Sequence, residues 1–394
     1  MTITPSTTRL RNSLNWIADL TDELTTEFSN IVVVSPREPA LEEAQTQLVA
    51  AISNLFPCSL CLIPAREAGK DLVSLSQIWE HLEDHGSNRR TLVIGLGGGT
   101  TLDVAGFAAS TYFRGVAFWS VPTTLLSMVD AGIGGKTGIN FHGFKNHIGS
   151  FAHPSIVWLC PQFLCTLPTE ELANGWAECL KHALLEGPDS WNRIQGISIL
   201  DENNQPRSEN LEVLWLPWIQ RQASFKLSIV EQDFKESGLR EILNAGHTVA
   251  HALESYSHRI HKVKKQSTSD NTTPIPHGKA VAWGLLIESL IGNTIPPQEL
   301  GNLASNHWIQ QLNQTVRTLY SPFPFQSWIA SGNAHLDDVI QDILALTRVD
   351  KKNKSASTKT VAASIITQPG DCSIQRALSL EDLAQCLKFF LESK

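Results

Sequence analysis

The chain has 394 residues, of which 42% are hydrophobic, and its formal net charge is -8. A chain of this length exceeds the size at which one hydrophobic core keeps growing, so we expect two domains. The acidic balance argues against a general nucleic-acid binder, although it is compatible with local basic pockets.

The first part of the chain alternates strand patterns with helical patterns. Short apolar runs that end in turns are typical of buried parallel strands, and they lie at residues 31–34, 60–64, 91–99 and 116–124. Helical apolar spacing separates them at 44–56 and 72–84. The pattern predicts a Rossmann-like α/β domain over residues 1–165, whose parallel sheet is covered on both faces.

The pattern changes in the second part of the chain. Helical segments dominate residues 166–394 and strand candidates are few, which predicts a mostly α-helical domain. Within it, residues 262–276 are polar and end in proline, so we expect a surface loop there.

The seven cysteines are an odd number without a disulfide framework, which favours a reducing compartment, the cytoplasm. Cys58 and Cys61 form a CxxC inside an apolar run, where thiols more often act as small hydrophobic residues than in redox or metal chemistry. The first residues lack the apolar segment of a signal peptide, and no 18 apolar residues run together. We therefore expect neither secretion nor a membrane span.

Two histidines four residues apart predict a metal site. His247 and His251 share a helical face, while His277 and Glu178 lie elsewhere in the helical part. Imidazole and carboxylate are ligands that zinc prefers, and three protein ligands leave a fourth position open for substrate. A histidine pair alone also fits a helix that buries a histidine as a satisfied core residue.

A glycine cluster follows the third strand pattern. Gly97, Gly98 and Gly99 precede a helix that we expect to begin near Thr101 or Asp103. Glycine removes the Cβ obstacle, and free N–H groups at a helix start attract phosphate oxygens. The signal is weak alone, because sharp turns also need glycine, and the cluster departs from the GxGxxG fingerprint.

Isolated polar side chains follow in a glycine-rich stretch. Asp130, Lys136, Lys145 and Asn146 stand among small residues there, which suggests the wall of a ligand site rather than a loop with solvated lysines. Asp130 lies inside an apolar run, and a buried carboxylate needs a partner.

A cluster of residues that can bind an anion lies close to the histidines in the sequence. Arg240 and Asn244 are four residues apart, and we expect one helix to present them in a row with His247 and His251. Arginine matches carboxylate or phosphate with a planar fork. The cluster implies a small anionic substrate.

These motifs together resemble the sugar phosphate cyclase superfamily, and 3-dehydroquinate synthase in particular. The matching stretches are AREAGK, GGGTTLDVAGF, YFRG, VPTTLLSMVDAGIGGKTGIN, KNHIGSF, WAECLKH, GLREILNAGHTVAHALE, PHGKAVAWG and VDKK. They occur in the family's order over roughly residues 60 to 355. The resemblance implies a dehydroquinate synthase-like fold and a homodimer.

The resemblance also implies roles for individual residues. Zinc, with Co2+ as another possible ion, would be held by Glu178, His247 and His277. NAD would be bound by Glu67, Lys70, Gly97, Gly98, Gly99, Asp103, Thr123, Thr124, Lys136, Lys145 and Thr166. Substrate would meet Asp130, Lys136, Asn146, Lys181, Lys226, Arg240, Asn244 and His251, with Lys351 or Lys352 at its phosphate. Arg114 would reach the phosphate in a neighbouring subunit.

The family's reaction is a redox-neutral cyclisation: transient oxidation by NAD beside zinc, phosphate elimination, return of the hydride, and aldol closure. Retention of Lys226, Arg240, Asn244 and His251 favours 3-deoxy-arabino-heptulosonate 7-phosphate as the substrate and 3-dehydroquinate as the product.

Other features favour different functions. Three departures from the dehydroquinate synthase pattern favour cyclases of sedoheptulose 7-phosphate. They are Leu102 where glycine is usual, the missing proline turn after Asp130, and Lys279 in place of glutamate. A metal-dependent alcohol or glycerol dehydrogenase and a catalytically inactive binding homologue are further alternatives. The cationic residues argue against a neutral alcohol, and the complete ligand set argues against an inactive homologue.

Overall fold

The computed structural model describes residues 8–142, 144–200, 211–267, 274–300, 306–330, 334–349 and 359–392. The chain divides into two compact units, residues 1–175 with 199–235, and residues 176–198 with 236–394. In the sequence, residues 199–235 of the first unit interrupt the second unit. The predicted domain boundary between residues 165 and 166 therefore stays a prediction.

Parallel strands form the core of the first unit. Within the described ranges one sheet has six strands in the order β1-β8-β5-β4-β2-β3, all paired in parallel. The bounds of its strands are Arg9–Asn12 (β1), Asn30–Pro36 (β2), Cys58–Ile63 (β3), Thr91–Gly97 (β4), Ala117–Pro122 (β5) and Ile156–Leu159 (β8). β2 and β4 are buried along their whole length, as a sheet covered on both faces requires. The predicted parallel α/β sheet is confirmed.

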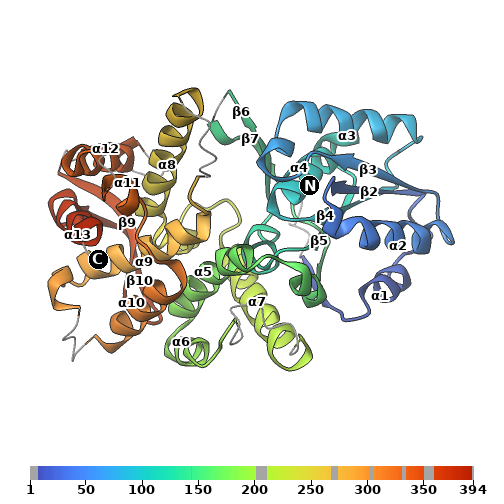
Figure 1. Ribbon diagram of the computed structural model, residues 1–394. Coiled ribbons are helices and arrows are strands. Elements are labelled where there is room, and N and C mark those ends of the chain that lie inside the picture. Colours follow the sequence, from blue (N-terminus) through green and yellow to red (C-terminus); the bar gives the residue numbers. More distant parts are fainter. Residues whose placement is uncertain are drawn as a thin grey trace. The chain divides into compact units, whose positions relative to one another are not determined.

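Helices cover both faces of this sheet (Figure 1). Leu75, Ile78 and Leu82 of α3 pack with Val104 and other residues of α4 on one face, and α2 lies on the other. The helical segments of this unit are Trp16–Asp22 (α1), Glu42–Ser53 (α2), Leu72–Asp84 (α3), Gly99–Thr111 (α4) and Leu216–Gln232 (α7), with short turns Pro39–Leu41 (η1), Arg66–Gly69 (η2), Tyr112–Arg114 (η3), Ser127–Ala131 (η4), Pro161–Thr166 (η5) and Leu211–Trp215 (η6).

A second, smaller sheet in this unit was not predicted. β6 (Lys136–Phe141) and β7 (Phe144–Phe151) pair as an antiparallel hairpin in the glycine-rich stretch. A Cβ on Gly138 or Gly149 would lie within 2.4 Å or 2.1 Å of the backbone of the facing strand. Glycine therefore permits the close strand pairing here, and its abundance hid the strand pattern.

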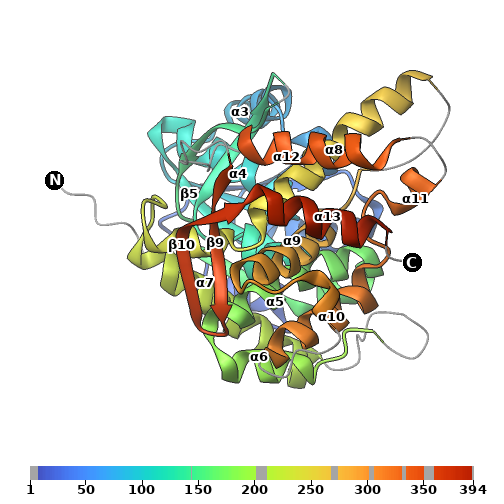
Figure 2. The ribbon, with the colours of Figure 1, turned by 90° about the vertical axis from the view of Figure 1, so that its left-hand side faces the viewer.

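The second unit is mostly helical, as expected, and it contains one further hairpin among its described residues. α5 (Thr169–Glu186) begins in the first unit and continues into this one. The other elements are α6 (Pro188–Gln195), η7 (Leu239–Asn244), α8 (His247–Ser267), α9 (His277–Gly292), η8 (Pro297–Glu299), α10 (His307–Tyr320), α11 (Gln326–Ala330), α12 (Leu336–Val349), β9 (Thr360–Gln368), β10 (Asp371–Ser379) and α13 (Leu380–Glu392). Figure 2 shows β9 and β10 side by side, with α13 continuing from β10.

One loop prediction was wrong at its start. α8 continues to Ser267, so the surface loop expected over 262–276 does not begin at residue 262. Composition alone does not distinguish a polar helix end from a loop. Residues 268–273 of that prediction lie outside the described residues.

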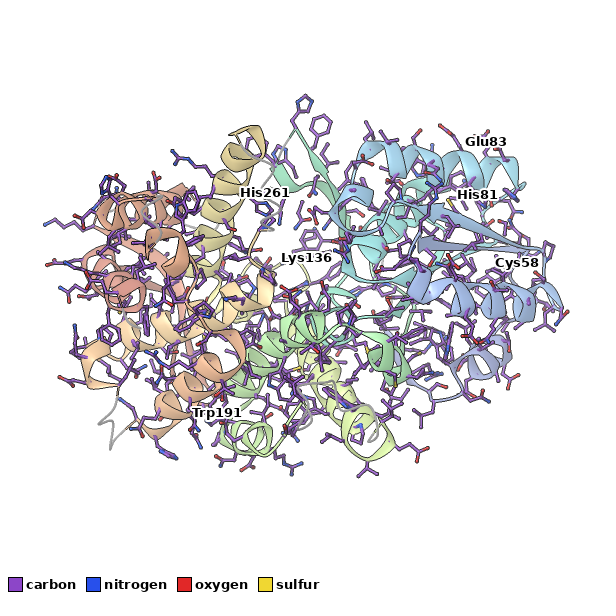
Figure 3. All side chains as sticks on the ribbon, in the orientation of Figure 1. Cys58, His81, Glu83, Lys136, Trp191 and His261 are labelled. Atoms are coloured by element: carbon purple, nitrogen blue, oxygen red, sulfur yellow. The ribbon has the colours of Figure 1, made fainter. Side chains whose placement is uncertain are left out.

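The CxxC cysteines lie on β3, as expected for small hydrophobic residues. Figure 3 labels Cys58, the first residue of this strand. Burial raises the pKa of both the Cys58 and the Cys61 thiols to about 11, so both are protonated at neutral pH. Neither belongs to a group that could hold a metal among the residues the structure describes. Over that same part of the chain, no helix has the length and apolar character to span a membrane.

Candidate functional site

Three residues of the second unit meet as a metal-binding group. Glu178 lies on α5, while His247 and His277 are the first residues of α8 and α9. Their ligand atoms all lie within 4.8 Å of one another. Glu178 Oε1 is 3.4 Å from His247 Nε2 and 3.3 Å from His277 Nε2. Atoms bound tetrahedrally to one zinc ion at about 2.0–2.1 Å lie about 3.3 Å apart, so the spacing fits the ion.

The surroundings of Glu178 and His247 set the protonation states of these two side chains. Burial alone would raise the pKa of Glu178, but Lys181 and His247 hold it well below its usual range. Lys181 Nζ forms a buried ion pair with Glu178 Oε2. Burial, followed by the charge of Lys181, lowers the pKa of His247 to about 4. Glu178 is therefore a carboxylate and His247 a neutral imidazole at pH 7, the forms that bind metal.

His277 differs in its charge state without a metal. Burial alone would lower its pKa, but hydrogen bonds to Glu178 and Glu254 raise it to about 10. Two carboxylates thus face one imidazole. A divalent ion at Nε2 would take the place of the proton that this arrangement otherwise retains.

The helix expected to present Arg240, Asn244, His247 and His251 in a row is broken, so that prediction was wrong. Arg240 and Asn244 lie on η7, which ends at Asn244, and α8 starts at His247. Gly246 between them has a φ of +79°, and a Cβ there would lie 2.7 Å from Leu285 Cγ of α9. The close approach of α9 and the left-handed backbone require glycine and end the helix.

A buried carboxylate supports the start of α8. Glu288 of α9 is 2% exposed and accepts hydrogen bonds from the backbone N–H of Gly246 at 2.8 Å and of Val249 at 2.9 Å. These are N–H groups that a helix start leaves without intrahelical partners, and negative charge is favourable there. Glu288 thereby holds the turn that carries His247, and sequence reasoning did not identify it.

We expect Glu288→Ala to lower the free energy of unfolding by about 2–4 kcal/mol, because two buried N–H groups lose their acceptor. Thermal melting of the metal-free protein measures the loss without a contribution from bound ions. Glu288→Gln, which keeps an acceptor oxygen, should lose less. Equal melting temperatures for wild type and Glu288→Ala would show that water replaces the carboxylate at no cost.

The hairpin β9–β10, which was not predicted, forms hydrogen bonds to η7, the turn that carries Arg240. Ser364 of β9 donates a hydrogen bond to the Glu241 carbonyl at 2.7 Å, and Gln375 of β10 donates one to the Glu241 carboxylate. Arg240 is 2% exposed. Asn244 Nδ2 donates to Glu236 Oε1 at 3.0 Å, a partner that sequence reasoning also missed.

His251 lies one helical turn after His247, and the two ring centroids are 5.5 Å apart. It is not a member of the metal-binding group that His247 forms with Glu178 and His277. The structure thus separates the histidines of the HxxxH pair, with one in the ligand group and the other beside it.

Some of the residues predicted for a nucleotide lie at the carboxyl ends of β4 and β5. α4 begins at Gly99, earlier than the expected Thr101 or Asp103. A Cβ on Gly99 would lie 2.9 Å from Ala131 Cβ, so only glycine lets the helix start this close to η4. The Thr123 N–H donates to the Gly97 carbonyl at 3.0 Å, which joins the ends of β4 and β5. In such sheets, ligands bind outside the carboxyl ends of the strands.

Asn140 contacts two further residues predicted for the nucleotide, Glu67 and Lys70. Lys70 is buried and forms an ion pair with Asp103 of α4. The Asn140 N–H donates to the Lys70 carbonyl at 2.9 Å, and its side-chain amide donates to Glu67 Oε1 at 2.5 Å. Its side-chain oxygen accepts from the Asn146 N–H at 2.9 Å. Asn140 therefore joins the η2 turn to the β6–β7 hairpin, and it was not predicted.

The remaining candidates of this unit are the substrate residues Asp130, Lys136, Asn146 and Lys226 and the nucleotide residue Lys145. Asp130 has the partner that its apolar surroundings required, because Lys226 of α7 lies 2.8 Å from its Oδ1. Lys136 starts β6 (Figure 3), and Lys145 and Asn146 lie on β7; these three are exposed.

The last predictions concern Arg114, Thr166 and the pair Lys351 and Lys352. Arg114 is exposed on η3, with a φ of +66°. Thr166 ends η5 and donates to the Phe163 carbonyl at 3.3 Å. Lys351 and Lys352 lie outside the described residues.

Comparison with known proteins identifies the family. Residues 60–174 match the family model described as 3-dehydroquinate synthase N-terminal, and residues 175–353 match the one described as 3-dehydroquinate synthase C-terminal. A 3-dehydroquinate synthase of Pyrococcus furiosus is 42% identical over 275 residues, which is 69% of this chain and 74% of that protein. The chain belongs to the 3-dehydroquinate synthase family.

Solved structures share the fold at lower identity. A 2-deoxy-scyllo-inosose synthase complexed with carbaglucose-6-phosphate, NAD+ and Co2+ has a TM-score of 0.75 at 20% identity, with 96% of each chain covered. ValA, the 2-epi-5-epi-valiolone synthase from Streptomyces hygroscopicus with NAD+ and Zn2+ bound, also has 0.75, at 21% identity over 100% of this chain and 99% of its own. The dehydroquinate synthase-like fold is confirmed.

One departure from the 3-dehydroquinate synthase pattern is explained by packing. Leu102 of α4 is 3% exposed. Its side chain lies 3.1 Å from the positions that a Cβ would take on Gly95 and on Gly132. The larger residue is therefore accommodated in the core next to glycines. Lys279, another departure from that pattern, lies in the first turn of α9.

Proposed function

We propose that this chain is a 3-dehydroquinate synthase that uses NAD and zinc. It would convert 3-deoxy-arabino-heptulosonate 7-phosphate into 3-dehydroquinate and phosphate. The observation that carries the proposal is that the ligand atoms of Glu178, His247 and His277 meet within 4.8 Å of one another, in the unit that also contains the buried Arg240. The family and the names of its relatives support the same activity.

The metal-binding residues would hold Zn2+ and leave a coordination position for a substrate hydroxyl. Bound there, the ion would supply Lewis acidity to that oxygen. Lys181 keeps Glu178 ionised, and Glu288 holds the turn before His247. Both contacts come from the protein itself and hold the ligand side chains in place.

The residues proposed for NAD are those around the glycine turn. Gly98 and Gly99 expose the first N–H groups of α4, a favourable place for a pyrophosphate. Glu67, held by Asn140, would face ribose hydroxyls. The bound cofactor would supply a reversible hydride acceptor, which a redox-neutral cyclisation needs. We also propose Gly97, Lys70, Asp103, Thr123, Thr124, Lys136, Lys145 and Thr166 as nucleotide contacts.

The remaining residues supply charge and hydrogen bonds to an anionic sugar. The Arg240 fork suits a carboxylate, and Asn244 and His251 can fix hydroxyl or phosphate oxygens. Lys226 is oriented by Asp130. We propose the same class of role for Asp130, Lys136, Asn146, Lys181 and either Lys351 or Lys352. We further propose a cytoplasmic homodimer in which Arg114 reaches the neighbouring subunit's phosphate site.

A second candidate is a sedoheptulose 7-phosphate cyclase, and Lys279 is the observation that favours it. It stands two residues after His277, where the family pattern has glutamate. The experiment that decides supplies the protein with NAD and Zn2+ and offers the two sugar phosphates separately. Phosphate release and product mass identify the substrate, and the proposal expects release from the carboxylated sugar. Stoichiometric NADH accumulation on a simple alcohol would instead identify a dehydrogenase.

A further inference from the structure

The second ring nitrogens of the two histidine ligands have different partners. Each Nε2 faces Glu178 Oε1. The Nδ1–H of His247 donates to the Ala245 carbonyl at 3.1 Å, whereas the Nδ1–H of His277 donates to the carboxylate of Glu254 at 3.3 Å. One ligand is therefore oriented by a neutral backbone group and the other by a negative charge.

Glu254 lies on the ligand-bearing face of α8. Residues 247, 251 and 254 are spaced by four and then three, so their side chains share one helical face. The Glu254 side chain is 15% exposed. It is not a member of the ligand group of Glu178, His247 and His277. Glu254 therefore meets the ligand group at the outer nitrogen of His277.

α8 also holds the segment that leads into α9. The Ile275 N–H donates to Ser257 Oγ at 2.9 Å. His277 is the first residue of α9, so no preceding turn of its own helix fixes its ring. Ser257 and Glu254, three residues apart on α8, thus fix the approaching backbone and the imidazole respectively. Without Glu254, the ring could rotate about its side-chain bonds and move Nε2 away from Glu178.

We propose that Glu254 is a positioning residue that directs His277 Nε2 to the metal and raises its affinity, an inference that rests on the proposed metal site. A carboxylate on the outer nitrogen fixes the ring, selects the tautomer with the free lone pair on Nε2, and makes that nitrogen a better donor. Loss of such a partner weakens metal binding about 10- to 100-fold.

The test measures zinc dissociation constants by competition with a chelator in wild type, Glu254→Ala and Glu254→Gln. We expect a dissociation constant about 10- to 100-fold higher for Glu254→Ala. Glu254→Gln, whose amide oxygen still accepts the Nδ1–H but carries no charge, should fall between it and wild type. Asp342→Asn is the matched control, because Asp342 is a carboxylate that pairs with α8 at Arg259, 3.1 Å away. It should bind zinc as wild type does.

Two readouts separate this role from a structural one. If Glu254 only supports folding, the metal-free protein should melt at a lower temperature while folded protein keeps its zinc affinity. If it positions His277, the absorption bands of bound Co2+ should also change, since they report ligand geometry. A zinc dissociation constant of Glu254→Ala within twofold of the wild-type value would overturn the inference. Failure of wild type to bind zinc would instead overturn the proposed function.

Discussion

Glu178→Gln should lose its zinc on dialysis, with a dissociation constant raised by more than about 100-fold. Glu178 is fully buried and its Oε1 faces both histidine ligands, so the amide removes the only charge that the three ligands carry in their metal-binding forms. Loss of an outer-shell partner alone costs about 10- to 100-fold, and a ligand should cost more. Activity should fall with metal content. Metal analysis after dialysis and turnover of the sugar phosphate measure the two effects.

The same substitution should also destabilise the metal-free protein. Lys181 is 1% exposed and its ion pair with Glu178 is buried, and removing one member of such a pair costs about 3–5 kcal/mol. Added zinc should raise the melting temperature of wild type but not of the variant. Glu170→Gln, an exposed change in the first turn of the same helix, serves as the control. Full zinc occupancy in Glu178→Gln would mean that other residues hold the ion.

The central strands were predictable because they are buried on both faces. Burial requires unbroken apolar runs, and β-branched residues such as those at 31–34 mark them clearly. The two hairpins were not predicted, for two reasons. β6–β7 depends on glycines that allow close pairing, and β10 is largely exposed and carries polar residues. A hydrophobic pattern cannot reveal strands such as β10 that contribute little to the core. β9 is different, because its Val361 and Ile365 are buried and its apolar run was missed.

The candidate ligands could be predicted one by one from the sequence. The contacts that orient their side chains could not. An HxxxH pair suggests a metal site because helical spacing is local. The break at Gly246 depends on the close approach of α9, which lies thirty or more residues later. Glu288 and Glu254 likewise act across helices, on α8 from α9 and on His277 from α8. These contacts exist only after tertiary packing, so no local spacing indicates them.

The second large effect should come from Arg240→Ala, which we expect to lower kcat/KM for the carboxylated sugar by at least about 150-fold. The guanidinium is buried on η7, and removing it deletes charge-assisted hydrogen bonds worth about 1.5–3 kcal/mol each. NAD affinity should be nearly unchanged. Arg240→Lys retains the charge without the fork, so it should recover part of the loss. Arg193→Ala, an exposed change on α6, is the control.

A second substrate separates binding from folding in this experiment. Sedoheptulose 7-phosphate has the phosphate but no carboxylate, so any reaction or competitive binding that it shows should change far less in Arg240→Ala. A carboxylate clamp therefore predicts a loss confined to the carboxylated sugar, with zinc content intact. If both sugars lose equally while zinc remains bound, Arg240 contacts the phosphate or shared hydroxyls instead. If zinc is also lost, the change has disturbed the turn before α8, which Glu241 and the β9–β10 hairpin hold in place.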